Sequence, residues 1–258
     1  MASIKERLKQ GELVIGTFIS EVRNPNVAYM LAQAGFDFFV LDNEHGSFSV
    51  ETVSDMVAAA RGSGLEVIVR IPEIRRESIL KPLDSGAAGL LVPQVNTPEQ
   101  ACELVWHAKY PPMGNRGAAL RRAHSLYGRP NAAEYLAKAN DETLLVVQAE
   151  SREAIRNADR IAAVEGIDCV FCGPFDLSVS LGIPGQLAHP MEVEAIETML
   201  AACRKAGKAA GILLFDPAAL KPWIEKGIRF ACYSSDINML ADAAMKAVEE
   251  LRRSQAKG

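Results

Sequence analysis

Short, strongly apolar segments alternate with amphipathic helical patterns along the whole chain, and this alternation restricts the fold more than any other feature. The apolar segments are rich in Val, Ile, Leu and Phe, which is typical of strands buried on both faces of a parallel sheet. Eight of them occur, at residues 13–19, 36–41, 66–71, 89–95, 143–148, 169–172, 210–215 and 229–233. Eight strand–helix repeats predict a closed parallel (β/α)8 barrel.

Helical patterns fill the connections, at residues 24–34, 50–61, 97–109, 152–164, 191–206 and 217–226. Asn24-Pro25 and Asp216-Pro217 are typical helix starts, because a capping side chain precedes a proline in the first turn. Residues 1–258 have the usual size of one such barrel, so we expect a single domain. The alternative is an open doubly wound sheet, but the turn after the first strand lacks the glycines of a phosphate-binding loop.

One connection is too long for a simple barrel loop. It runs from Tyr110 to Glu142 and contains a further helical pattern near residues 131–139. Long insertions of this kind are usually lids or subunit contacts. A surface loop without function is the other interpretation.

Composition excludes several classes of partner. The net charge is −4, with acidic and basic residues interspersed, so neither nucleic acid nor an anionic membrane is an expected partner. The first ten residues are charged and helix-forming, and no apolar run approaches the length of a membrane span, so we expect a soluble cytoplasmic protein. Cys169 and Cys172 have a C-x-x-C spacing, but they lie in an apolar strand without a second pair, which favours buried reduced thiols.

Polar side chains gather where the predicted strands end. In a parallel barrel all strand ends of this kind converge on one face, which is where barrel enzymes keep their active sites. The residues at these ends are Asp42, Glu44, His45, Arg70, Gln94, Asn96, Gln148, Glu150, Gly173, Pro174 and Asp176.

Two of these residues suggest a metal site. Glu150 and Asp176 follow adjacent strands, and two carboxylates with water are a common way of holding Mg²⁺. Mn²⁺ or Co²⁺ would suit the same oxygens. Arg70 ends an otherwise apolar strand, so it either forms a structural ion pair or receives a substrate carboxylate or enolate oxygen. A nearby metal site favours the substrate role.

His45 is the one histidine at a predicted strand end, and Asp42 lies three residues before it. A carboxylate that close can orient the imidazole and raise its basicity, so we predict a general base. No lysine lies at the end of a predicted strand, so an aldolase that works through a Schiff base is excluded. A barrel that forms carbanions without lysine must use a metal.

The chain resembles the HpcH/HpaI aldolase family, which contains the class II pyruvate aldolases. The resemblance covers residues 16–236 and its motifs keep the family's order. They are Leu41-Asp42-Asn43-Glu44-His45-Gly46, Val69-Arg70-Ile71-Pro72, Gly89-Leu90-Leu91-Val92-Pro93, Gln148-Ala149-Glu150 and Gly173-Pro174-Phe175-Asp176-Leu177-Ser178.

The resemblance implies a role for each matching residue. Glu150 and Asp176 would bind a divalent ion that chelates a 2-oxo acid, and Gln148 would line that site. Arg70 would stabilise the pyruvate enolate, while His45, oriented by Asp42, would act as base and acid. The last motif would receive the pyruvate carboxylate, with Gly173 beside the backbone amides of Phe175 and Asp176.

The resemblance also implies an assembly. Asp84 matches a carboxylate that family members contribute across a subunit interface, and the family usually forms hexamers with the last helix exchanged between neighbours. Phe175 stands where many members have a small residue, so the aldehyde partner stays open. The alternatives are a decarboxylase or CoA-ester lyase, for which only Arg116, Arg121 and Arg122 offer a basic groove, and a non-catalytic barrel that senses 2-oxo acids.

Overall fold

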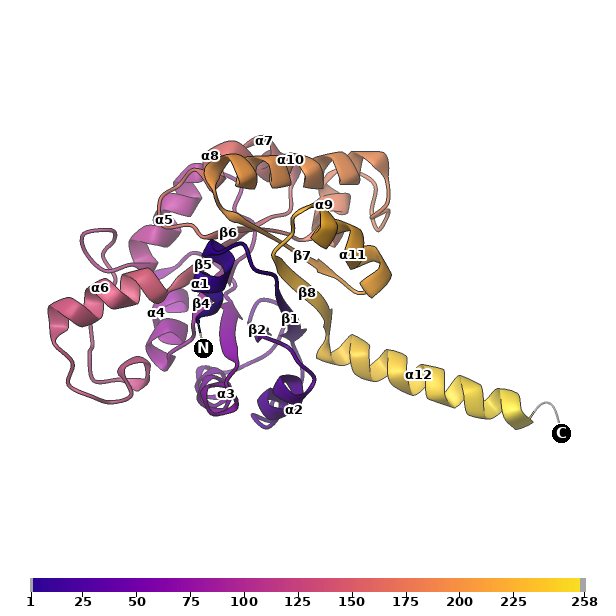
Figure 1. Ribbon diagram of the computed structural model, residues 1–258, viewed down its shortest axis with the longest axis horizontal. Coiled ribbons are helices and arrows are strands. Elements are labelled where there is room, and N and C mark those ends of the chain that lie inside the picture. The colour runs from indigo at the N-terminus through magenta and orange to yellow at the C-terminus, as the bar shows by residue number, and fades with distance from the viewer. Residues whose placement is uncertain (1, 256–258) are drawn as a thin grey trace.

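The computed structural model describes residues 2–255 and contains a closed barrel of eight parallel strands (Figure 1). Each strand pairs with the next along the chain, and the last pairs with the first, so the predicted α/β barrel is confirmed. The strands are β1 (Val14–Ile19), β2 (Phe38–Asp42), β3 (Glu66–Arg70), β4 (Gly89–Val92), β5 (Leu144–Ala149), β6 (Cys169–Cys172), β7 (Ala209–Leu214) and β8 (Phe230–Ser235).

Helices follow the strands, and most of them cover the outside of the barrel (Figure 1). They are α1 (Ile4–Lys9), α2 (Val27–Gln33), α3 (Val50–Ser63), α4 (Arg76–Ser85), α5 (Pro98–Ala108), α6 (Ala132–Glu142), α7 (Arg152–Arg156), α8 (Ala158–Ala162), α9 (Pro174–Ser180), α10 (Pro190–Ala206), α11 (Pro217–Lys226) and α12 (Asp236–Gln255), with a 3-10 turn at Ala123–Ser125. None of the helices in residues 2–255 is long and apolar enough to cross a membrane.

The predicted helix boundaries are right where a local cap decides them. Asp216 accepts a hydrogen bond from the backbone of Ala218 at 2.9 Å, and α11 starts at the predicted proline. The predicted start at Asn24-Pro25 is wrong by two residues, because residues 25 and 26 form a turn and α2 starts at Val27. The Asn24 side chain accepts a hydrogen bond from the Asn26 backbone within this turn. The single helix predicted over residues 152–164 is also wrong, because the chain breaks into α7 and α8 at Asn157.

The core has two apolar layers, one inside the barrel and one between the strands and the helices. Aromatic rings fill the interior: Phe38 stacks on Phe230 with ring centroids 4.4 Å apart, and Phe171 meets Phe230 edge-on. Gly16 makes room for them, because a Cβ there would lie 2.3 Å from the Phe38 ring. Cys169 and Cys172 are buried free thiols, as predicted.

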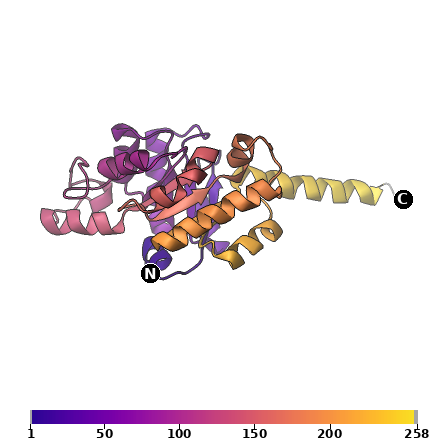
Figure 2. The same ribbon diagram turned by 90° about the horizontal axis from the view of Figure 1, so that it is seen from above.

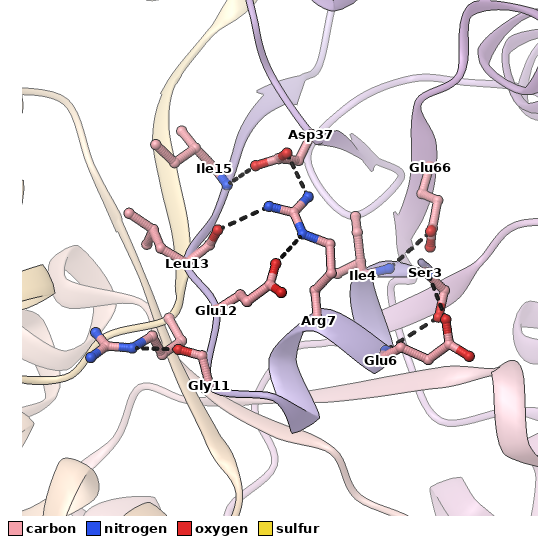
Figure 3. A network of polar contacts seen from close by, with 11 residues as sticks. Ser3, Ile4, Glu6, Arg7, Gly11, Glu12, Leu13, Ile15, Asp37 and Glu66 are labelled. Atoms are coloured by element: carbon pink, nitrogen blue, oxygen red, sulfur yellow. Dashed lines mark hydrogen bonds and ion pairs between the residues drawn. The ribbon is translucent and has the colours of Figure 1, made fainter. Parts of the chain in front are cut away.

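Helix α1 covers the end of the barrel where the strands begin. Ile4 and Leu8 belong to the interior apolar layer, and the Ile4 backbone donates to the Glu66 carboxylate at 2.9 Å at the start of β3. Arg7 donates to Asp37 just before β2 at 2.6 Å (Figure 3). These contacts close one end of the barrel, and the opposite end carries the strand-end residues.

Two buried lysines lie near the closed end. Lys109 donates to the carbonyl oxygens of Asn140 and Thr143 at 2.6 Å each, and Lys5 donates to the same Thr143 oxygen while pairing with Asp168 at 3.0 Å. Burial, followed by the charge of Lys5, lowers the pKa of Lys109 to about 7. The insertion therefore packs firmly onto the barrel through its two ends.

The insertion and α12 lie on opposite sides of the barrel (Figure 1). Helix α12 extends away from the barrel in both views (Figures 1 and 2). It exposes large apolar side chains, including Leu240 at 71% and Met245 at 62%.

Candidate active site

Arg70, the last residue of β3, is held by two carboxylates. Its Nε and Nη2 donate to the two oxygens of Asp42 at 2.9 and 2.7 Å, and Nη1 lies 3.0 Å from Glu44 Oε2. Its Cζ lies 5.2 Å from the ring centroid of Phe18, inside the barrel. An arginine has five N–H donors, so these contacts leave two for a ligand. Burial alone would lower the pKa of Arg70, but Asp42 and Glu44 raise it above its ordinary value.

Asp42 acts on His45 through the backbone, which differs from the predicted contact with the imidazole. The backbone N–H groups of Glu44 and His45 donate to Asp42 Oδ1 at 3.1 and 3.3 Å. Asp42 and Arg70 are register partners on β2 and β3, so the guanidinium occupies both oxygens of the carboxylate. The His45 side chain is exposed, and no hydrogen bond to its ring is present within residues 2–255.

Glu150 follows β5 and is 2% exposed. Its Oε1 accepts a hydrogen bond from the backbone of Gln94 at 2.9 Å, and its Oε2 accepts one from the Gln148 side chain. Gln94 adopts a left-handed backbone with φ of 54°, which aims this N–H at the carboxylate. A side chain on Gly173 would put a Cβ 2.4 Å from Glu150 Oε2, so glycine is required for this approach.

Burial raises the pKa of Glu150 to about 7, and the negative charges of Asp176 and Glu44 add to this effect. The Gln94 hydrogen bond and the charge of Arg70 act in the opposite direction but are outweighed. Burial also raises the pKa of Glu44, with the neighbouring Asp42 and Asp176 contributing. The site therefore holds more negative charge than it can easily stabilise without a cation.

Asp176 lies in the first turn of α9 and is exposed, as is Phe175 at 62%. The first backbone hydrogen bond of this helix runs from Leu177 to Gly173, at 3.0 Å. The N–H groups of Phe175 and Asp176 precede it, so they have no partner within the helix and can receive an anion.

A divalent cation fits these residues. Asp42 and Glu44 pair with the Arg70 guanidinium, whose charge also acts on Glu150. Burial and the charge of Asp176 raise the pKa of both Glu44 and Glu150, and Gln148 Oε1 is buried without a hydrogen-bond partner. No group of three or more His, Cys, Asp or Glu in the described chain is arranged to hold a metal. An ion here would therefore take two protein carboxylates and complete its shell with water or substrate oxygens.

Asp84 lies apart from this cluster within the single chain. It sits near the end of α4, where Arg116 Nη2 donates to its Oδ1 at 2.7 Å and His124 Nε2 lies 3.8 Å from the same oxygen. No hydrogen bond or ion pair in residues 2–255 joins it to the strand-end residues.

Three residues around the site had no predicted role. Glu44 clamps Arg70, Phe18 lies against its guanidinium, and Gln94 holds Glu150. Glu44 and Gln94 follow predicted strands, so the sequence predicts that both lie at the strand-end face of the barrel. Their roles depend on contacts between different strands, which the sequence does not display.

The sequence profile of the HpcH/HpaI aldolase/citrate lyase family matches residues 15–243. The chain belongs to this family. This HpcH/HpaI protein is 38% identical to the hydroxypyruvate/pyruvate aldolase of Roseovarius nubinhibens, over 97% of this chain and 96% of that one. It is 39% identical to the 2-keto-3-deoxy-L-rhamnonate aldolase of Klebsiella pneumoniae, over 93% of this chain and 89% of that one.

A solved structure agrees with these similarities. The HpcH/HpaI aldolase from Desulfitobacterium hafniense superposes with a TM-score of 0.94 at 34% identity, covering 98% of this chain and 97% of that one. Both relatives are named for aldol reactions, so the predicted enzyme class, a carbon–carbon lyase, is confirmed.

Proposed function

We propose that this HpcH/HpaI aldolase is divalent-metal-dependent and joins or cleaves the bond between a pyruvate enolate and an aldehyde, acting on 4-hydroxy-2-oxo acids. The observation that carries the proposal is the arrangement around Arg70 and Glu150. A clamped guanidinium with two unused N–H donors lies in the same cluster as a buried carboxylate and an exposed one. The names of the two relatives support the substrate class, since both are aldolases of 2-oxo acids.

Glu150 and Asp176 would hold the ion, which could be Mg²⁺, Mn²⁺ or Co²⁺. When bound, the metal withdraws electron density from the oxygens of a 2-oxo acid and makes the neighbouring carbon easier to deprotonate. Gln148 holds the second oxygen of Glu150 and so fixes the direction of the first.

The chain's own residues supply the remaining steps. The backbone N–H groups of Phe175 and Asp176 receive the substrate carboxylate beside Gly173. The two unused N–H donors of Arg70 stabilise the oxygen that becomes negative as the enolate forms. In cleavage, His45 removes the proton of the 4-hydroxyl, the C3–C4 bond breaks, and its electron pair passes into the enolate. His45 then returns a proton to C3, which gives pyruvate and the aldehyde.

We further propose a homo-oligomer, a hexamer by resemblance, that works in the cytoplasm on small molecules without nucleic-acid or membrane partners. The apolar side chains of α12 support subunit exchange, because Leu240 and Met245 are exposed to water in the single chain and a neighbouring subunit would cover them. In this assembly Asp84 would act in the site of a neighbouring subunit.

The CoA-ester alternative loses part of its basis. Arg116 is buried and paired with Asp84, so only Arg121 and Arg122 of the three arginines are exposed to bind a CoA phosphate. No observation in the described chain favours a decarboxylase or a 2-oxo acid sensor.

The test is cleavage of a panel of 4-hydroxy-2-oxo acids, with pyruvate detected by coupled lactate dehydrogenase. Chelation with EDTA should abolish cleavage, and Mg²⁺, Mn²⁺ or Co²⁺ should restore it. Glu150→Gln should weaken metal binding on the order of 10²-fold or more. Full activity of thoroughly chelated enzyme would contradict the metal-dependent mechanism, and failure to cleave any member of the panel would contradict the substrate class.

A further inference from the structure

Asp84 is held from one side by a buried arginine of the insertion. Arg116 Nη2 donates to Asp84 Oδ1 at 2.7 Å, and the Arg116 side chain is 4% exposed while that of Asp84 is 23% exposed. Asp84 Oδ2 has no hydrogen bond within residues 2–255. One oxygen is therefore fixed inside the protein, and the other faces outward.

Arg116 is itself fixed. Its Cζ lies 4.7 Å from the ring centroid of Tyr110, and its backbone N–H donates to the Lys109 carbonyl at 2.9 Å. Its Nε is buried without a partner, so Asp84 supplies the one ion pair that this guanidinium forms in the described chain. Because a buried charge is costly unless it is paired, Arg116 and Asp84 hold each other in place.

His124 completes the surroundings of Asp84 Oδ1 without competing for it. Its ring contacts the Tyr135 hydroxyl through Nδ1 and the Ala119 carbonyl through Nε2. Burial lowers the pKa of His124, and the charge of Arg116 lowers it further, which favours the neutral ring. Arg116 is therefore the cation that pairs with Asp84.

We propose that Arg116 is a positioning residue that presents the outward oxygen of Asp84 to the active site of a second copy of this chain. This inference rests on the proposed function, in which Asp84 acts across an interface. Asp84, Arg122 and the exposed Tyr127 of the insertion line one pocket of about 290 Å³, and the proposal places the second copy against this face. The long insertion would then contribute to the shared active site, because it supplies Arg116 and the Tyr110 ring against which Arg116 packs.

The test is subunit complementation with the full-length chain and bound Mg²⁺. Three variants are prepared separately, Arg116→Met, Asp84→Asn and His45→Ala, and are mixed in pairs under conditions that exchange subunits. A site shared between subunits takes His45 from one copy and the Arg116–Asp84 pair from the other. Mixing Arg116→Met with His45→Ala should restore about a quarter of the sites for random exchange, whereas Arg116→Met with Asp84→Asn should restore none.

These pairs of variants distinguish the positioning role of Arg116 from the sharing of the active site between subunits. If Asp84→Asn with His45→Ala regains activity while Arg116→Met with His45→Ala does not, the positioning role is overturned and the shared site stands. If neither pair regains activity, the shared site in the proposed function fails, and the role of Arg116 fails with it. Rescue of Arg116→Met by Asp84→Asn would show that Arg116 does not act through the Asp84 of its own subunit.

Further variants separate positioning from folding. Arg116→Met should lower kcat on the order of 10-fold, and in an Asp84→Asn background it should lower kcat no further. If the two substitutions lowered kcat by the product of their separate effects in the double variant, the inference would be overturned. Arg116→Lys keeps a positive charge beside Asp84 and serves as the variant that preserves the fold. It should retain intermediate activity, because lysine cannot reproduce the guanidinium fork. Arg121→Met removes an exposed arginine from the same insertion and should leave kcat unchanged.

Discussion

Arg70 and Asp42 share two hydrogen bonds across neighbouring strands, 2.9 and 2.7 Å long, on a single carboxylate. This bidentate pair fixes the plane of the guanidinium, and Glu44 fixes its rotation from the other side. The two unused N–H donors therefore point in a defined direction before any substrate binds. Preorganised donors of this kind stabilise developing charge without the cost of reorientation.

Replacing Arg70 with alanine should lower kcat on the order of 10²-fold or more, the scale for removing one preorganised donor. Arg70→Lys should recover little of this loss, because a point charge cannot occupy the fork of Asp42. Both kcat for cleavage and the rate of pyruvate methyl-proton exchange would be measured in variants with native circular dichroism. Near-normal turnover by Arg70→Ala would reduce this arginine to a structural ion pair.

Metal binding should release a proton from Glu150 below neutral pH. Burial raises the pKa of this carboxyl to about 7, so below that pH the metal-free native protein keeps a proton that an ion must displace. For the same reason the raised pKa of Glu150 adds to the free energy of unfolding at acidic pH. This contribution is lost as pH rises through about 7. Metal affinity should therefore fall as pH decreases below 7 and level off above it.

Titration calorimetry in buffers of different ionisation enthalpy measures this release directly. Glu192 provides a matched control, since burial raises its pKa to about 7 as well, but it lies on α10 outside the cluster. Glu192→Gln should keep the pH dependence of metal affinity. An affinity that is constant between pH 6 and 8 in the wild type would contradict the assignment of Glu150 as ligand.

Gly173→Ala should weaken metal binding on the order of 10-fold or more while leaving the barrel folded. The added Cβ would lie 2.4 Å from Glu150 Oε2 and 2.7 Å from Gln148 Nε2, so both side chains must move. Gly128→Ala is the comparison, because its nearest contact is a carbonyl oxygen at 3.2 Å on the insertion. Equal metal affinities for the two variants would show that Gly173 does not shape the site.

Stability should increase with pH above neutrality because of Lys109. Its pKa falls from 10.5 to about 7 on folding, so the unfolded chain binds more protons between these values. The contribution of Lys109 to the free energy of unfolding is therefore largest above its ordinary pKa of 10.5, and it is lost as pH falls through about 7. Urea unfolding at pH 7.5 and 9.5 should show the increase in wild type and in Lys221→Met, an exposed-lysine control, and a smaller one in Lys109→Met. An equal increase in all three proteins would exclude Lys109 as the cause.

The enzyme should form no imine with pyruvate. No lysine belongs to the strand-end cluster in the described chain, and the buried Lys5 and Lys109 lie at the closed end of the barrel. Borohydride treatment in the presence of pyruvate should leave both the mass and the activity unchanged. A reduced adduct on any lysine, found by peptide mass spectrometry, would overturn the metal-dependent class.

The barrel was predictable because its signals are local. The predicted strand over residues 169–172 coincides with β6, and the cap at Asp216 starts α11 as expected. The break between α7 and α8 was not predictable, since the Asn157 side chain there donates to the Asn96 carbonyl, 61 residues away. Contacts over such separations decide helix boundaries without leaving a local pattern.

The candidate site likewise combines residues that local sequence patterns predict with contacts that they do not. Strand ends identified Glu150, Asp176 and Arg70 as candidates, because parallel strands bring their ends to one face. They did not identify the partner of Asp42, which depends on the β2–β3 register and on the competition between a guanidinium and an imidazole. The left-handed backbone of Gln94 has no sequence signal either, since glutamine rarely adopts it.

Closure of the barrel by α1 leaves the strand-end face as the side from which both reaction partners would enter. Glu150 is only 2% exposed, so a 2-oxo acid held beside it would lie deeper than the aldehyde that enters by the same face. In cleavage we then expect the aldehyde to depart before pyruvate, and in synthesis pyruvate to arrive first. The closed end of the barrel would thus give the two partners of the reaction an ordered kinetic sequence.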